Sequence, residues 1–230
     1  MINYYRIAQE KYRKAVKISR LLCLIPGLKM IAVCNNLSFN QAKLDSDIDL
    51  FIITAKNRVW TVRFFSLLLL KLLRLRPAFD KRGGSKDKIC LSFFISEDNL
   101  DLKKYKICVQ DDYLSFWIRQ LKPLYIENNI YKKFIQLNKW ALNKVSQQKY
   151  YYISNYKSNY KRQINKFLFK PLINFFVTRF DERIYKYIQL KIMPEAIKYA
   201  ACSWDSRVII SDNILKFHIN DARLVFKDKL

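Results

Sequence analysis

Histidine is nearly absent from the sequence and cysteine is never clustered, and these scarcities exclude several kinds of chemistry. His218 is the only histidine in 230 residues, so a zinc hydrolase, a Ser-His-Asp triad or a Cys-His pair would have to use it. The five cysteines are odd in number and never form Cys-x-x-Cys. This argues against a disulfide framework or a structural zinc site and is typical of buried thiols in a reducing cytoplasm. Carboxylates must therefore carry any catalysis.

Acidic residues and glycine are also scarce. The chain has 19 Asp and Glu residues against 43 Lys and Arg residues, for a net charge of +24, and only three glycines. Such an excess favours a polyanionic partner, such as RNA, nucleotide phosphates or an anionic membrane surface. A composition-biased genome, indicated by the abundance of Lys, Asn, Ile, Tyr and Phe, explains the charge equally well. The 51% hydrophobic content is enough for a substantial core.

No hydrophobic run is long enough to cross a bilayer. The N-terminal residues contain no apolar segment of signal-peptide length, and the most apolar run, FFSLLLLKLLRL at residues 64–75, falls short of the roughly 20 residues required. We therefore expect a cytoplasmic protein without a membrane-spanning segment, in which this run forms a core helix. Apolar and basic residues between Phe167 and Phe176 leave peripheral binding to an anionic membrane as a further alternative.

Hydrophobic periodicity predicts an α/β (α+β) fold, with a mixed sheet flanked by helices. In the first 125 residues the predicted helices cover residues 4–22, 58–75 (capped by Asn57) and 113–121 (capped by Asp111 or Asp112), and the predicted strands cover residues 28–34, 47–54 and 88–96. We assign residues 1–125 to one α/β domain.

Beyond residue 125 the pattern changes. Residues 127–148 and 163–200 read as helical, with breaks at Pro171 and Pro194. The last segment, from about residue 206, reads as extended with a turn at Asp212 and Asn213. We therefore predict a mainly helical C-terminal region over residues 126–230, with an extended terminal segment.

Acidic residues alternate in the segment LDSDIDLFIIT, at Asp45, Asp47 and Asp49. An extended chain places these three side chains on one face, where they repel one another unless a cation lies among them. Asp47 and Asp49 can supply the hard oxygen ligands that Mg²⁺ takes together with substrate phosphates, while Ile48 and Leu50 point into the core. The alternative is a solvated strand start with lysines nearby.

The same segment resembles the nucleotidyltransferase superfamily named after DNA polymerase β. The shared features are a buried strand at residues 28–34, a connection of about ten residues at 37–46, and a strand that begins Asp-hydrophobic-Asp-hydrophobic after a serine. The resemblance is strongest over residues 28–56 and weaker to residue 125, and it implies that residues 1–125 form a nucleotidyltransferase-like α/β domain. It implies that Asp47 and Asp49 bind Mg²⁺ with a nucleoside triphosphate and catalyse transfer of a nucleotidyl group to an unidentified acceptor.

The chain differs from this superfamily at two places. Asn35 and Asn36 stand where the family has Gly-Ser or Gly-Gly, and they become the candidate nucleotide-binding residues, because asparagine tolerates left-handed backbone angles and carries amide donors. Many active members also have a third carboxylate on a neighbouring strand. The polar positions of the matching strand here are Cys90, Ser92 and Ser96, and the nearest acidic candidates are Glu97, Asp98 and Asp45.

These differences leave a second hypothesis open, that of a catalytically decayed member that uses its charge to bind RNA or an acidic surface. The segment KYYYISNYKSNYKR at residues 149–162 interleaves aromatic and basic residues, as in single-stranded RNA binding, but is explained more simply as an exposed connection. His218, with Lys216 and Arg223, can likewise be read as a phosphate contact or as a structural residue.

Overall fold

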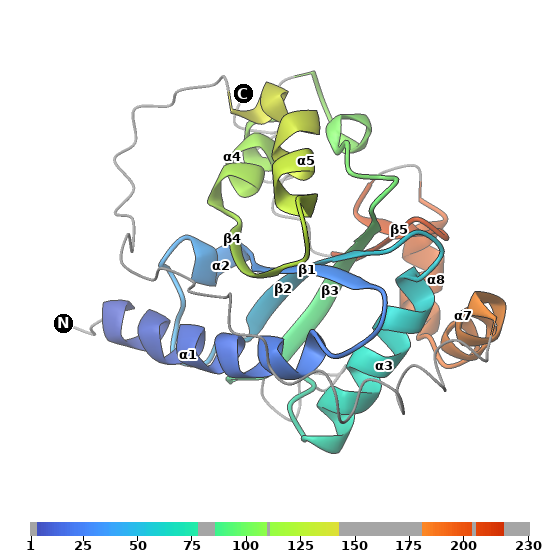
Figure 1. Ribbon diagram of the computed structural model, residues 1–230, viewed down its shortest axis with the longest axis horizontal. Helices are drawn as coiled ribbons and strands as arrows, with labels where there is room; N and C mark the ends of the chain where they lie inside the picture. Colours follow the sequence, from blue (N-terminus) through green and yellow to red (C-terminus); the bar gives the residue numbers. More distant parts are fainter. Residues whose placement is uncertain (1–3, 78–85, 110, 143–180, 204–205, 219–230) are drawn as a thin grey trace.

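The computed structural model describes residues 4–77, 86–109, 111–142, 181–203 and 206–218. Its strands are β1 (Leu28–Val33), β2 (Ile48–Thr54), β3 (Ile89–Ser96), β4 (Lys122–Ile126), β5 (Val208–Ile210) and β6 (Ile214–Phe217). They form one six-stranded sheet in the order β4-β1-β2-β3-β6-β5 (Figure 1). β2 and β3 run parallel, and the other neighbouring pairs are antiparallel. The α/β class predicted from the sequence is confirmed.

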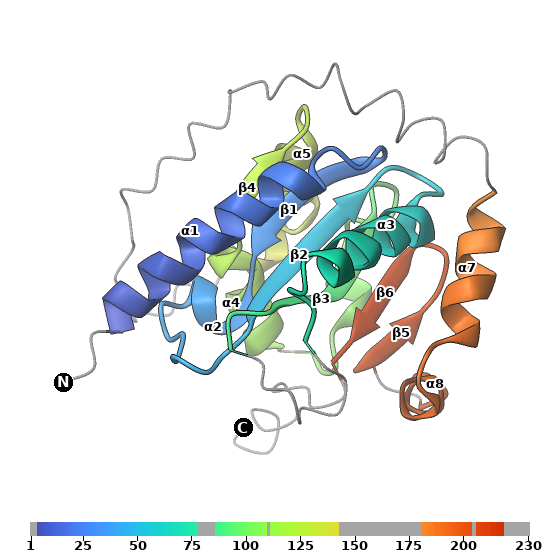
Figure 2. The same ribbon diagram turned by 90° about the horizontal axis from the view of Figure 1, so that it is seen from below.

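Helices cover both faces of the sheet. They are α1 (Tyr4–Leu22), α2 (Asn35–Ser38), α3 (Val59–Leu72), α4 (Asp112–Gln120), α5 (Ile130–Leu137), α7 (Glu182–Lys191) and α8 (Glu195–Ala201), with short 3-10 turns at Lys103–Tyr105 and Lys139–Ala141. α1 and α3 lie on one face, and α4 and α5 on the other (Figures 1 and 2). Within the described ranges, no helix is long and apolar enough to cross a membrane.

The sheet separates two hydrophobic cores. On the α1 and α3 side, Ile48, Leu50 and Ile52 of β2 are fully buried, whereas Phe51 and Ile53 are buried on the α4 and α5 side. Because β2 is covered on both faces, its sequence is a continuous apolar run and does not alternate. Asp49, the second residue of β2, is the acidic residue of the strand and is partly buried.

The C-terminal hairpin completes the sheet begun by the first half of the chain. β6 pairs with β3, with Phe93 opposite Lys216, and β5 pairs with β6 across a turn that includes Asp212 and Asn213. This confirms the predicted extended segment as far as residue 218. The sheet therefore takes strands from both sides of residue 125. The segments at residues 149–162 and 167–176, together with Pro171 and Arg223, lie outside the described residues.

Two local predictions were wrong. Strand β4 was not predicted. It contains Pro123, which has no N–H to donate, and this is tolerated because β4 is an edge strand of the sheet. The helix expected from residue 127 begins only at Ile130 and ends at Leu137, followed by the 3-10 turn. By contrast, Asp111 caps α4 as predicted, since its carboxylate accepts from Leu114 N–H at 2.8 Å.

Capping of α3 by Asn57 was also wrong, because a distant residue fills that role. Asn57 has a φ of 54° and lies outside the helix, which begins at Val59. The Glu182 carboxylate of α7 instead accepts from Trp60 N–H at 2.6 Å and from Thr61 N–H at 3.1 Å. A carboxylate at this end satisfies free N–H groups and suits the helix dipole. α7 is thereby tied to the start of α3.

Candidate metal centre

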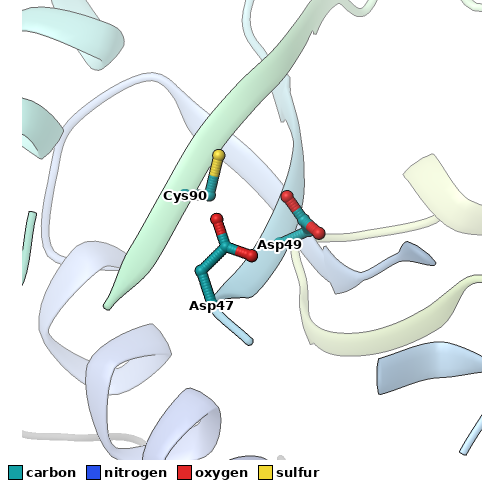
Figure 3. A group of neighbouring side chains, drawn as sticks. All are labelled: Asp47, Asp49 and Cys90. Atoms are coloured by element: carbon teal, nitrogen blue, oxygen red, sulfur yellow. The ribbon is translucent and has the colours of Figure 1, made fainter. Parts of the chain in front are cut away.

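The three potential ligands of the site come from two adjacent parallel strands. Asp47 lies immediately before β2, Asp49 is the second residue of β2, and Cys90 is directly opposite Asp49 on β3. One ligand atom from each residue lies within 4.8 Å of the other two (Figure 3). The structure thus brings together the two carboxylates singled out from the sequence and adds a thiol that was not predicted as a ligand.

A buried lysine fixes the loop that leads into Asp47. Lys11 of α1 is 2% exposed, and its ammonium group donates to the carbonyls of Leu44 at 3.2 Å and Ser46 at 2.7 Å. The same group pairs with the Asp87 carboxylate at 2.8 Å, and the Asp87 N–H donates to the Ser46 carbonyl. Because the loop is held at three points, Lys11 positions the backbone that presents Asp47 without being part of the ligand group.

Asn35 supports Asp49 from the end of β1. Its backbone is left-handed, with a φ of 54°. Its side-chain oxygen accepts from the indole N–H of Trp117 at 2.9 Å, and its amide hydrogen-bonds the Asp49 carboxylate. The indole bond fixes which way the amide faces, so its N–H₂ group is directed to Asp49. Asn36 is exposed on the same turn.

Negative charge accumulates at the site. Burial, followed by the charge of Asp47, raises the pKa of Asp49 above its usual range, and hydrogen bonds from Asn35 and Cys90 offset part of this. Burial and the charges of Asp49 and Asp47 likewise raise the pKa of the Cys90 thiol. Among the described residues, the groups that shift the pKa of Asp49 are Asp47, Asn35 and Cys90. A bound cation would relieve this repulsion.

A line of polar side chains continues from Cys90 across β3 to the end of β6. Cys90 hydrogen-bonds Ser92, and the Ser92 hydroxyl oxygen is 2.9 Å from His218 Nε2. β3 bulges here, since Asp49 pairs with Cys90 but Phe51 pairs with Phe93, which leaves one extra residue in β3. The only histidine therefore lies next to the ligand group, behind Ser92, although sequence reasoning gave it no partner there.

The acidic residues considered for the third ligand position lie elsewhere. Glu97 is at the opposite end of β3 from Cys90, and its carboxylate accepts from Lys56 N–H at 3.2 Å. Asp98 and Asp45 are exposed. Among the residues that the structure describes, the ligand group consists of Asp47, Asp49 and Cys90. The thiol occupies the place where the resemblance predicts a third carboxylate, a consequence of strand register that spacing alone did not reveal.

The three potential ligands differ in how well they suit Mg²⁺, the ion predicted from the sequence. Two carboxylates on a rigid strand suit Mg²⁺, which commonly takes one or two carboxylates and completes its shell with water and phosphate oxygens. Asp47 and Asp49 would hold it. The sulfur of Cys90 is not a ligand that Mg²⁺ favours. The site therefore fits Mg²⁺ through two of its three donors.

Comparison with known proteins identified no relative of this chain. No family model, no curated protein and no solved structure matches this chain. The similarity of residues 28–56 to the polymerase β-like nucleotidyltransferases thus stays a prediction, and the functional argument has to be made from the residues of the site.

Proposed function

We propose that this protein binds a nucleoside triphosphate with Mg²⁺ at Asp47 and Asp49 and transfers a nucleotidyl group to an acceptor. The observation that carries this proposal is the convergence of the two carboxylates beside Asn35 at one end of β2. Asp47 is the charged neighbour among the groups that raise the pKa of Asp49, so the two carboxylates repel one another. A divalent cation bound between them would offset this repulsion.

The residues divide into holding and positioning roles. Asp47 and Asp49 hold the ion, which when bound neutralises the triphosphate and assists attack by the acceptor hydroxyl. Asn35 orients Asp49, and Lys11 fixes the loop before Asp47. Asn35 and Asn36 remain the candidate nucleotide-binding residues, through N–H groups at the turn after β1.

Calorimetry with charge-neutral variants tests the proposal. The wild-type protein should bind ATP or another nucleoside triphosphate in the presence of Mg²⁺, and the double variant Asp47→Asn, Asp49→Asn should lose this binding. Asp45→Asn is the matched control, because it makes the same change two residues earlier at an exposed position, and it should bind as the wild type does. Equal affinity of the double variant and the wild type would refute the site.

One observation favours a second candidate function. A thiol stands at the third ligand position, so a carboxylate that could serve as general base is missing from the described group. A decayed nucleotidyltransferase fold that binds RNA or an acidic surface through its net charge of +24 agrees with this. It would bind RNA without Mg²⁺, whereas the first proposal requires the ion.

A further inference from the structure

The third donor of the candidate metal centre is a sulfur atom, whereas the other two are carboxylate oxygens. This difference affects which ion the centre prefers. We propose that Asp47, Asp49 and the thiolate of Cys90 form a three-donor site for a thiophilic divalent ion such as Zn²⁺, in preference to Mg²⁺. The inference deepens the proposed function and rests on it, since it concerns the ion at the same carboxylates.

The backbone places the three donors with little freedom. Asp49 and Cys90 are opposite one another in adjacent parallel strands, and the Lys11 contacts hold the loop before Asp47. Donors around a tetrahedral zinc ion lie about 3.5 Å apart, given Zn–O and Zn–S bonds of about 2.0–2.3 Å. The donors here lie within 4.8 Å of one another. Side-chain movements that shift the donor atoms by about an ångström would bring them to the distances of a zinc site.

A divalent cation, held by the neighbouring carboxylates, is what would favour the thiolate of Cys90. Two carboxylates lie beside it, so a divalent cation is attracted by both and screens the sulfur from them. The Ser92 hydroxyl also hydrogen-bonds the sulfur, and its oxygen is 2.9 Å from His218 Nε2. Such outer groups orient and stabilise a metal ligand. Binding breaks the S–H bond, the metal–sulfur bond forms, and the proton passes to solvent.

The ligand set separates the two classes of ion. Thiolates select zinc and related transition ions, whereas Mg²⁺ prefers oxygen alone. Three protein donors also match the catalytic type of zinc site, in which a fourth position stays open for water or substrate. A phosphate oxygen of the nucleotide can take that position. The substitution of a thiol for a carboxylate thus changes the preferred ion without removing the open position.

Cobalt spectroscopy tests the thiolate directly. Co²⁺ is titrated into the full-length protein as a stand-in for Zn²⁺, and a near-ultraviolet sulfur-to-cobalt charge-transfer band is expected at one equivalent. Cys90→Ser should abolish the band and weaken Co²⁺ binding by at least about ten-fold, the lower end of the loss seen when only an outer-shell partner is removed. Cys202→Ser is the control, because it removes an exposed thiol on another element, and its band should be that of the wild type.

A second variant keeps the test decisive if serine disturbs the strand. Cys90→Asp supplies a third oxygen, so its affinity for Mg²⁺ should rise and its preference for Co²⁺ should fall. The absence of a band in the wild type, or a band that persists in Cys90→Ser, would overturn the inference. If the wild type then still binds triphosphate with Mg²⁺ through Asp47 and Asp49, the proposed function stands without it. A Cys90-dependent band in a protein that binds no triphosphate would refute the proposed function alone.

Discussion

Asn35 shows how much one residue can contribute to this site. Its left-handed backbone turns the chain at the end of β1, and its amide group links Trp117 to Asp49. Glycine would satisfy the first requirement and not the second, because it has no side chain to hydrogen-bond. Asparagine at position 35 is therefore explained by two roles that this residue type combines well.

Substitutions at Asn35 should separate these two roles. Asn35→Gly removes the hydrogen bonds only, and we expect the free energy of unfolding to fall by about 1–3 kcal/mol, since the Trp117 indole N–H loses its partner. Asn35→Ala adds a methyl group at a φ of 54° and should cost about 1–2 kcal/mol more. Urea denaturation measures both. Asn36→Ala, at the exposed neighbour, is the control, and an equal cost at the two asparagines would contradict this account.

At the scale of elements, helix α1 and the loops around residues 44–46 and 87 are joined by one ammonium group. Lys11 donates to two carbonyls and to the Asp87 carboxylate. Partial burial raises the pKa of Asp87, but the hydrogen bond and charge of Lys11 outweigh this, so the pKa lies below its usual value. Because the pKa is lower in the folded state, the ion pair stabilises the fold above a pH of about 4 and this contribution is lost as the pH falls further.

The variant Lys11→Met should therefore have a pH-dependent effect. At pH 7 we expect the free energy of unfolding to fall by about 1–3 kcal/mol, because two carbonyls and a carboxylate lose their donor. The difference from the wild type should narrow below a pH of about 4, where Asp87 becomes protonated in both proteins. Chemical denaturation at several pH values measures this. Lys17→Met, at an exposed position of the same helix, is the control and should show neither effect. If Lys11→Met lowered the free energy of unfolding equally from pH 7 to pH 3, the ion pair with Asp87 would not contribute.

At the scale of the whole molecule, the net charge of +24 leads us to predict salt-dependent RNA binding that does not involve the metal centre. If the second candidate function holds, the logarithm of the affinity for single-stranded RNA should fall steeply and linearly with the logarithm of salt concentration, with a slope of about −0.7 per phosphate contacted. Fluorescence anisotropy with labelled oligonucleotides measures the slope. Magnesium should act only as added salt. A flat salt dependence would argue against RNA binding through this charge.

Much of the fold and part of the site follow from local sequence patterns. Continuous apolar runs identified β1, β2 and β3, apolar residues spaced among basic ones identified α1, and the turn at Asp212 and Asn213 separated β5 from β6. These signals are readable because they depend on neighbours within a few residues. β4 escaped prediction because its edge position, which tolerates Pro123, is a property of the assembled sheet.

The sequence by itself determined the α/β class and singled out Asp47 and Asp49, because their alternation before an apolar strand is a local pattern. Only the tertiary structure decided that Cys90 joins them, that Asn35 links Trp117 to Asp49, and that Glu182 caps α3. Each of these depends on strand register or on the packing of segments that are separated along the chain. Such contacts arise from burial of the two cores as a whole, which no short stretch of sequence encodes.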